Sequence, residues 1–540
     1  MTPNPNDLAA NLGQLFMVGF HGLTPPPGLI ELIQRERVGG IILFSRNCRD
    51  ARQVSRLTRD LQAAAREAGH DQPLLIAVDQ ENGLVRRLGA AITNLPGAMA
   101  LGATGDETLT EEVAAATARE LLALGINMNL APVADVNSNP ANPVIGVRSF
   151  GQDPALVARL TAAATRGYQA AGMAATLKHF PGHGDTAVDS HLALPVLPHD
   201  RARLDTIELI PFRAGVAAGA GALMLAHLRL PGIAPDEDTP ASLSPAVTRL
   251  ARESLGFQGV IMTDCLEMGA VAKSVGVARG AALALQAGAD LVLISHTLNR
   301  QRAAIAQTRA ALASGELAEE PLRQAMGRMR AFKRRFLAWE RLPAPVERAS
   351  VSAPAHQRLR DRGYQRAVTL VRDEARLLPV HLDVGARVAV LACPPARVSQ
   401  ASDSAYPHAA LVERVRAHHA NTTGVEIGRG AGRVSASAAL EMARDASLTI
   451  LTLLNAGRDP RQASLIRRLL ATGRPLIAIG VSDPYDLAAF SALPTCLATY
   501  EYTPAALAAA ADAIFGAITP RGRLPIMLAA PAISPTAPSA

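Results

Sequence analysis

The chain has 540 residues, of which 49% are apolar, and its formal net charge is +7. This length exceeds the size at which one hydrophobic core stops growing, so two domains are expected, and the composition excludes a fibrous or largely disordered protein. The basic residues are spread through the predicted helices and only 3% of residues are aromatic, which argues against nucleic-acid binding.

The first twenty residues lack a basic segment followed by an uninterrupted apolar one, so no secretory signal is predicted. No apolar run reaches the length of a membrane span. The cysteines are scattered without a Cys-x-x-Cys spacing, which favours a reducing compartment; they are Cys48, Cys265, Cys393 and Cys496. We therefore expect a cytoplasmic protein without a membrane span.

Short apolar runs alternate with longer stretches of helical spacing through the first 300 residues. The runs are 39–44, 74–79, 126–135, 174–180, 222–228, 259–264 and 289–295, with helices predicted at 154–171 and 276–287 among the intervening stretches. Continuous apolar strands between helices predict a parallel sheet that is covered on both faces. At least seven such units favour a (β/α)8 TIM-type barrel over an open sheet. No glycine-rich phosphate motif follows the first strand, so no dinucleotide cofactor is predicted.

The barrel domain is predicted to cover residues 1–345 and to end with a helix near Trp339. Residues 346–358 are rich in Pro, Ala and Ser and are predicted to form a linker. A second α/β series follows, which predicts a smaller C-terminal αβα sandwich over 359–530 and a flexible tail over 531–540. Its expected strands are 387–393, 448–454 and 475–480, and its expected helices are 461–472 and 504–517.

Polar residues stand at the C-terminal ends of the predicted barrel strands. They are Asp79, Asp135, Lys178 with His179, His227, Asp264 and His296. In a barrel these ends converge on one mouth, where the active site is built. The pattern therefore predicts a single site at that mouth.

The segment "KHFPGHGDTAVDSH", residues 178–191, follows one of these strands and holds three histidines and two aspartates. His179 and His183 have a spacing that can bind zinc on a helix, but the Pro and two Gly between and beside them prevent a regular turn, so no metal site is predicted. In "DSH", Asp189 can hold one ring nitrogen of His191 and prepare the imidazole for general acid and base catalysis.

An acid at the barrel mouth needs a partner. Asp264 ends a buried strand and is a candidate nucleophile for a covalent intermediate, although the sequence places no cation beside it. Lys178 and Arg148 are candidate hydrogen-bond donors to a substrate. Lysine is rare in this chain, because only Lys178, Lys273 and Lys333 are lysines and the other 51 of the 54 cationic residues are arginines. A compact ammonium group is therefore expected to be required at position 178.

Four motifs, "AVDQENGLVRRL", "NPVIGVRSFG", "KHFPGHGDTAVDSHLALP" and "MTDCLEMGA", resemble the family 3 glycoside hydrolases in their bacterial β-N-acetylglucosaminidase (β-hexosaminidase) branch. The resemblance is strong over residues 10–340, and 360–530 resembles the sandwich domain of two-domain members more weakly. It implies that Asp264 is the nucleophile and that His191, paired with Asp189, is the acid/base. It also implies that N-acetylglucosamine is bound by Asp79, Arg87, Arg148, Lys178 and His179.

The chain departs from the family pattern beside Asp79. Two glycines and an arginine are usual where this chain has Asn82, Gly83 and Leu84, and this change is expected to alter contacts next to the sugar subsite. Arg87 remains in register with the pattern.

The resemblance implies a retaining, exo-acting β-N-acetylglucosaminidase that acts on short glycans and needs no cofactor. A histidine acid/base does not repel an anionic aglycone, which favours peptidoglycan (muropeptide) fragments as substrates. The single tryptophan cannot form a stacking platform for a long polysaccharide. Two alternatives remain open at this point: a phosphorylase that uses phosphate as the acceptor, and a non-catalytic sugar-binding protein. The sequence does not predict an oligomeric state.

Overall fold

A computed structural model describes residues 7–234, 239–346, 351–393, 407–428, 430 and 432–528. The chain divides into two compact units: Met1–Leu95 with Asp106–Leu359, and Pro96–Gly105 with Arg360–Ala540. Helix α14 (Pro354–Ala367) begins inside the predicted linker. Residues 347–350 of that linker and the predicted tail 531–540 lie outside the described residues.

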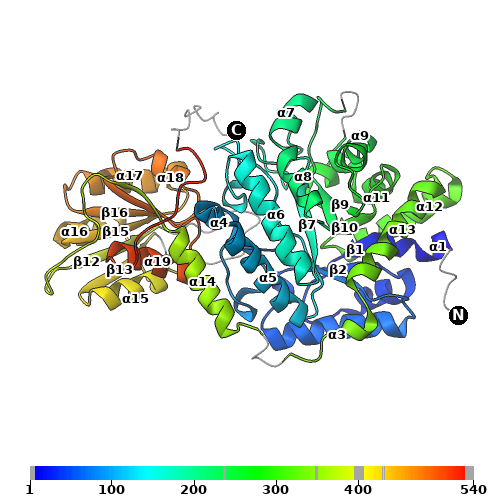
Figure 1. The fold of residues 1–540 in the computed structure, drawn as a ribbon, viewed down its shortest axis with the longest axis horizontal. Coiled ribbons are helices and arrows are strands. Elements are labelled where there is room, and N and C mark those ends of the chain that lie inside the picture. Colours follow the sequence, from blue (N-terminus) through cyan, green and yellow to red (C-terminus); the bar gives the residue numbers. More distant parts are fainter. Residues whose placement is uncertain are drawn as a thin grey trace. The chain divides into compact units, whose positions relative to one another are not determined.

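The first unit is a closed barrel of eight parallel strands, which confirms the predicted TIM-type architecture (Figure 1). The strand order around the barrel is β1-β10-β9-β8-β7-β6-β3-β2. The strands are β1 (Phe16–Val18), β2 (Gly40–Leu43), β3 (Leu75–Val78), β6 (Met128–Asn129), β7 (Ala174–Phe180), β8 (Ala222–Leu225), β9 (Val260–Cys265) and β10 (Leu291–Ile294).

Two of these strands differ from the sequence-based expectation. The three-residue strand β1 was not among the predicted runs, and β6 has only two residues where a strand over 126–135 was predicted. Pro132 lacks the amide hydrogen that a ladder needs, so only an isolated bridge between Val133 and Lys178 continues the pairing beyond β6. The last barrel helix ends at Phe336 rather than near Trp339, which lies in a short 3-10 turn, Trp339–Arg341.

Helices surround the barrel, and several begin at an aspartate whose side chain accepts a hydrogen bond from the first turn, as Asp50 does for α3. The main helices are α3 (Ala51–Glu67), α5 (Glu107–Ala123), α6 (Pro154–Ala170), α8 (Leu209–Ala217), α11 (Val277–Gln286), α12 (Leu298–Ser314) and α13 (Glu319–Phe336). The helices predicted at 154–171 and 276–287 are thereby confirmed as α6 and α11.

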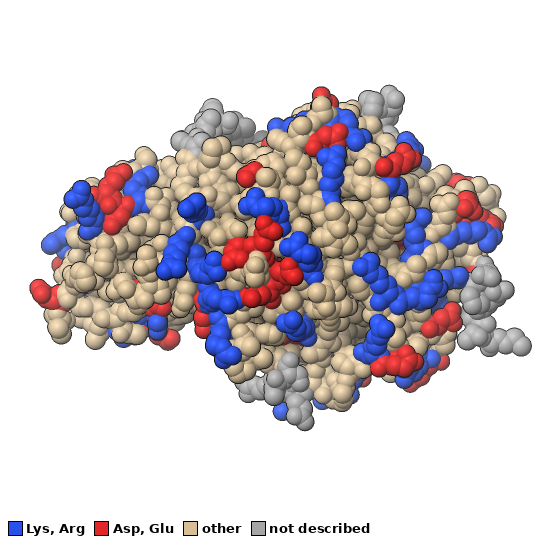
Figure 2. Space-filling model, viewed as in Figure 1, with Lys and Arg blue, Asp and Glu red and all other residues tan. Residues whose placement is uncertain are grey.

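Charged side chains of both signs are interspersed on the surface that Figure 2 displays, where acidic groups over α5 and α6 are surrounded by basic ones. Arg166 of α6, for example, lies 2.9 Å from Glu111 of α5. No helix among the described residues is both long and apolar enough to cross a membrane.

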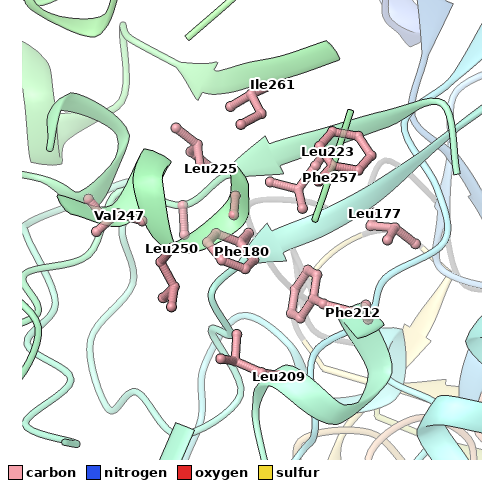
Figure 3. Close-up of a cluster of buried hydrophobic side chains, with 14 of the residues drawn as sticks. Leu177, Phe180, Leu209, Phe212, Leu223, Leu225, Val247, Leu250, Phe257 and Ile261 are labelled. Atoms are coloured by element: carbon pink, nitrogen blue, oxygen red, sulfur yellow. The ribbon is translucent and has the colours of Figure 1, made fainter. Parts of the chain in front are cut away.

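A buried apolar cluster packs α8 against β7, β8 and β9 (Figure 3). The rings of Phe180 on β7 and Phe212 on α8 meet edge to face with centroids 5.3 Å apart, and both residues have no exposed surface. Leu177, on the same strand, and Leu223, on β8, are equally buried. Each such side chain contributes about 1.5–3 kcal/mol on burial, so this cluster holds rigid the strand from which the 178–191 loop departs.

The second unit contains a seven-stranded sheet in the order β11-β17-β16-β15-β12-β13-β14, in which only β11 is antiparallel to its neighbour. Figure 1 shows α15 (His408–His418) and α19 (Pro504–Ile514) on one face and α16 (Ala436–Asp445) with α17 (Pro460–Leu470) on the other, as expected for a sandwich. The three predicted strands are confirmed as β12 (Val388–Ala392), β15 (Leu448–Leu453) and β16 (Leu476–Gly480).

The remaining elements of this unit include both predicted helices, which are α17 and α19. The strands not predicted are β11 (Thr369–Asp373), β13 (Thr422–Ile427), β14 (Arg433–Val434) and β17 (Thr495–Ala498). The helices are α15 (His408–His418), α16 (Ala436–Asp445), α17 (Pro460–Leu470), α18 (Tyr485–Ala488) and α19 (Pro504–Ile514).

Candidate active site

A buried network of ions lies at the C-terminal ends of β3 and β7. The Lys178 ammonium nitrogen is 2.6 Å from Asp79 Oδ1 and 2.6 Å from Glu81 Oε1. Glu81 also accepts two hydrogen bonds from Arg148, at 2.9 Å from Nε and 2.8 Å from Nη2. The predicted residues Asp79, Lys178 and Arg148 are therefore brought together, and Glu81 joins the two cations.

The charges in this network are maintained in spite of their burial. Burial raises the pKa of Glu81, but Arg148 and Lys178 lower it further, so the pKa lies well below its usual range. For Lys178, burial lowers the pKa and the attraction of Asp79 and Glu81 outweighs that effect, so the pKa is raised. The result is a compact network in which two cations donate to two carboxylates and which water reaches poorly.

His179 contacts the same guanidinium nitrogen of Arg148 that donates to Glu81. Its Nδ1 is 2.7 Å from Asp135 Oδ2, and its Nε2 is 3.2 Å from Arg148 Nη2. Because a guanidinium can only donate, His179 Nε2 must accept, and Nδ1 therefore carries the proton that is donated to Asp135. Asp135 has no exposed surface and also accepts a hydrogen bond from the backbone amide of His183 at 2.7 Å.

His183 is a structural residue of the loop. Its Nδ1 is 2.8 Å from the hydroxyl of Thr186, and its Nε2 is 3.0 Å from the hydroxyl of Ser190. Burial, with the neighbouring His179, lowers the pKa of His183 to about 4, so the ring is neutral at physiological pH. Both nitrogens are used within the loop, and this ring ties residue 186 to residue 190.

Asp189 and His191 form the dyad that the sequence predicts. Asp189 Oδ1 accepts a hydrogen bond from His191 Nδ1 at 2.7 Å and another from the backbone amide of His191 at 2.8 Å. Burial raises the pKa of Asp189, but these contacts lower it further, so the carboxylate is ionised. The side chain of His191 is 37% exposed. With Nδ1 engaged, Nε2 is the ring nitrogen left to exchange a proton with a ligand.

Asp264 lies in β9 at the same mouth, and three histidines surround it. Burial raises the pKa of Asp264, whereas the nearby rings of His227, His179 and His191 lower it, and the outcome is a lowered pKa. Its Oδ1 accepts the amide hydrogen of Cys265 at 2.7 Å. The polar partners that the sequence does not predict for Asp264 are therefore imidazole rings from neighbouring parts of the barrel mouth.

The loop that carries His191 is docked on the turn that follows Asp264. The backbone amide of Gly269, the first residue of α10 (Gly269–Ala272), donates to the carbonyl of His191 at 3.2 Å. A Cβ atom at position 269 would lie 2.8 Å from that oxygen and 2.7 Å from the carbonyl oxygen of Leu192, closer than real Cβ atoms approach. Glycine at 269 is thus required for the loop to rest there.

The base of the same loop is held by a second set of contacts. The side-chain amide of Asn142 donates to the carbonyls of His183 and Gly184 at 2.8 Å and 3.0 Å, and His199 Nε2 is 2.7 Å from Asp185 Oδ2. A Cβ at Gly184 would lie 1.7 Å from the carbonyl oxygen of Val136. The loop is therefore closely packed at its base.

Arg87 follows a short hairpin formed by β4 (Gln80–Asn82) and β5 (Val85–Arg86). It is buried, and its guanidinium carbon lies 5.7 Å from the ring centroid of Phe44. Asn82, where the family pattern has glycine, adopts φ +67° and donates to the hydroxyl of Thr117 at 3.0 Å. Asparagine tolerates this left-handed conformation, so the turn that precedes Arg87 is retained in spite of the substitution.

Three residues of the site are absent from the predicted set of site residues: Glu81, Asp135 and His227. His227 is buried, and its Nε2 donates to the carbonyl of Cys265 at 3.0 Å. Asp135 and His227 carried a signal, since both stand at predicted strand ends. The signal for Glu81 is its position two residues after Asp79, which in an extended segment places both carboxylates on one side.

Two clusters in the described part of the chain have side chains suited to a metal ion: Cys265 with Glu267 and His296, and Asp185 with His199 and Glu208. In the second, Asp185 is already paired with His199, and Arg203 lies 3.3 Å from Glu208. Neither cluster includes His191 or Asp264, and we assign no metal to them.

A TIM-type barrel that has a carboxylate, an imidazole held by a second carboxylate and buried cations at its mouth has the groups needed for nucleophilic and acid/base chemistry on a bound ligand. The model of the glycosyl hydrolase family 3 N-terminal domain matches residues 8–331 of the chain. The chain therefore belongs to glycosyl hydrolase family 3, and this membership supports an enzyme rather than a non-catalytic sugar-binding protein.

Named relatives agree with this assignment. The chain is 38% identical to beta-hexosaminidase A of Pseudoalteromonas piscicida over 377 residues, which cover 66% of this chain and 62% of that protein. The match thus spans less than two thirds of that relative's length. A beta-hexosaminidase of Stenotrophomonas maltophilia is 38% identical over 289 residues, or 52% of this chain and 83% of that protein.

The fold is also that of a solved structure. A glycoside hydrolase family 3 beta-N-acetylglucosaminidase from Paenibacillus sp. str. FPU-7 superimposes with a TM-score of 0.90 at 41% identity and covers 96% of this chain and 99% of its own. The similarity therefore extends over both units, including the C-terminal sheet.

Proposed function

We propose that the protein is a retaining, exo-acting β-N-acetylglucosaminidase that removes terminal N-acetylglucosamine from short glycans, and that peptidoglycan (muropeptide) fragments are its substrates. The observation that carries the proposal is that the loop bearing the Asp189–His191 pair is hydrogen-bonded, through the carbonyl of His191, to Gly269 in the turn that follows Asp264. The names of the relatives and of the Paenibacillus structure support the choice of sugar.

In the proposed reaction the Asp264 carboxylate attacks the anomeric carbon while protonated His191 donates its Nε2 proton to the leaving oxygen. The glycosidic bond breaks, and the sugar becomes linked to Asp264 as an ester. Neutral His191 then takes a proton from water, whose oxygen attacks the anomeric carbon and releases Asp264 with net retention. The lowered pKa of Asp264 supports its role as an ionised nucleophile.

The buried polar side chains are proposed to hold the sugar in place for this attack. Lys178 has an ammonium group with three donors, and Arg148 and His179 lie beside it. We assign these three residues, together with Asp79 and Arg87, to the terminal sugar subsite. The imidazole acid/base places no negative charge beside the aglycone, which supports an anionic leaving group such as a lactyl-bearing sugar.

Replacement of His191 by alanine tests the proposal. Cleavage of a substrate with a poorly acidic leaving group is expected to fall about 10²–10⁴-fold, because general acid catalysis is lost, whereas an activated aryl N-acetyl-β-glucosaminide is affected less. His381→Ala, at an exposed histidine of the second unit, is the matched control and should change neither rate. Equal losses on both substrates would contradict the acid role of His191.

Phosphorolysis is the second candidate, because a histidine in place of a carboxylate acid/base does not repel a phosphate acceptor. Product analysis in the presence of phosphate separates the two reactions. Hydrolysis gives free N-acetylglucosamine at a rate independent of phosphate, whereas phosphorolysis gives the 1-phosphate. A strong preference for the acetamido sugar over the plain glucoside is expected in either case.

A further inference from the structure

A second group of buried cations lies at the other end of the barrel. Lys333 on α13 is only 2% exposed, and Arg37 is 7% exposed. Together with Gln14 and Arg330 they line a cavity of about 30 Å³. These residues are close to the amino ends of the strands, whereas Lys178 and Asp264 stand at the carboxyl ends. The cavity is therefore separate from the candidate active site.

The hydrogen-bonding capacity of the two cations is only partly used. Among the described residues, the Lys333 ammonium donates to one partner, Gln14 Oε1 at 2.9 Å, and so retains two further donors. Arg37 donates from Nη1 and Nη2 to the carbonyls of Ala68 and Gly69, both at 2.9 Å. Its Nε is buried and has no partner in the described part of the chain.

Negative charge is scarce around this cavity. The lining contains one carboxylate, that of Asp71, which is on the exposed side. His70 lies beside Gln14, and burial lowers its pKa to about 4, so it is neutral. Burial, followed by the repulsion of Arg37, lowers the pKa of Lys333 to about 7. A negative ion beside the ammonium would oppose both effects and favour its charged form.

The backbone at Arg37 indicates that its side chain is needed there. Arg37 adopts φ +56°, in the left-handed region that normally favours glycine. A non-glycine residue in this region costs about 1 kcal/mol, and the guanidinium offsets that cost through its buried contacts.

We propose that this cavity binds a small monovalent anion, with chloride as the representative ligand, between the Lys333 ammonium and the Arg37 guanidinium. One water-sized sphere needs about 10–15 Å³, so the volume suits a monatomic ion and excludes phosphate or a sugar. Because the site lies away from the barrel mouth, the anion is expected to stabilise the fold and to leave the catalytic rate unchanged. This proposal does not depend on the proposed function.

Thermal unfolding of the full chain tests the proposal. Chloride is titrated against gluconate at constant ionic strength for the wild type, Lys333→Met and the control Arg334→Met, which alters an exposed cation one residue further along α13. At tenfold excess over its Kd, chloride should raise the Tm of the wild type and the control by roughly 2 °C. Lys333→Met should lose this response. An equal response in Lys333→Met, or no response in the wild type, overturns the proposal.

Diffraction from wild-type crystals that contain bromide is a second measurement, and it decides the matter if Lys333→Met does not fold. An anomalous peak beside the Lys333 nitrogen is expected at the halide concentration that saturates the thermal shift. An empty cavity at that concentration, or water alone, overturns the proposal.

Discussion

Replacing Glu81 by glutamine tests whether this residue positions the two cations of the sugar subsite. The substitution keeps the size of the side chain and one acceptor oxygen but removes the charge that joins Lys178 to Arg148. Lys178 retains its contact with Asp79 at 2.6 Å, whereas Arg148 loses its bidentate carboxylate partner. The variant is therefore expected to fold, with Arg148 as the more disturbed of the two cations.

The size of the effect follows from the burial of the pair. Removing one charge of a buried ion pair costs about 3–5 kcal/mol. Because the glutamine keeps one acceptor oxygen and Asp79 remains as an anion, we expect a loss at the low end of this range, roughly 3 kcal/mol in the free energy of unfolding. Because the cations lower the pKa of Glu81, the stabilisation is present at neutral pH and is lost only as the pH falls through that lowered value.

The catalytic effect is expected to exceed what the loss of stability alone would cause. A hydrogen bond from a charged donor is worth about 1.5–3 kcal/mol, so displacing Arg148 should lower kcat/KM ten- to hundredfold. The assay is hydrolysis of a chromogenic N-acetyl-β-glucosaminide, with inhibition by N-acetylglucosamine, well below the Tm of the variant. Glu107→Gln, in an exposed ion pair, is the control and should change neither kcat/KM nor the inhibition by N-acetylglucosamine. A folded Glu81→Gln protein with kcat/KM within twofold of the wild type would refute the reasoning.

Gly269→Ala should lower kcat/KM about 100-fold with little change in Tm, because its Cβ would lie 2.8 Å from the carbonyl oxygen of His191. The control Gly327→Ala, which has open space around it, should leave activity unchanged. Equal kcat/KM values for the two variants would contradict the docking of the loop. Lys178→Arg should abolish activity although the positive charge is retained, because the larger guanidinium does not fit the space of the lysine side chain, which is only 2% exposed. Kinetics on the purified variant check this. Burial raises the pKa of Asp483 to about 6, so the folded state loses stability as the pH rises from 4 to 6. Asp483→Asn should therefore be more stable than the wild type by about 3 kcal/mol at pH 8 and by little at pH 4, as followed by thermal unfolding.

The sequence predicted the barrel because buried parallel strands appear as uninterrupted apolar runs. It did not predict β1 or the shortness of β6, since three residues and two residues are too few to form a pattern. In the second unit, β13 was missed because only Thr422 in it is buried and it contains Gly424, and β17 because its Thr495 and Cys496 shorten the apolar run. Pattern-based prediction thus succeeded where a long apolar run marks the strand, and it failed where the strand is very short or contains polar residues or glycine.

The same distinction holds for the site. Asp189 and His191 are two residues apart, so their hydrogen bond could be predicted from the local sequence. Glu81 and Arg148 are 67 residues apart, and only the closure of the barrel brings them together. The surroundings of Asp264 are likewise formed by rings from β7, from the segment that follows β8 and from the 178–191 loop, and no local pattern encodes such a set.

The membership of Pro96–Gly105 in the second unit has a consequence for dividing the chain. Within that unit the amide of Gly97 donates to Glu501 at 2.9 Å, and Ala103 accepts from the amide of Arg523 at 2.9 Å. Helix α4 (Ala98–Thr104) buries most of its residues, including Leu101. A cut between the barrel and the following residues would leave this apolar helix on one fragment and expose, on the other fragment, the apolar surface against which the helix packs. The two units are therefore not expected to be separable by simple truncation. Each would have to be produced by circular permutation, or by moving residues 96–105 together with the C-terminal segment.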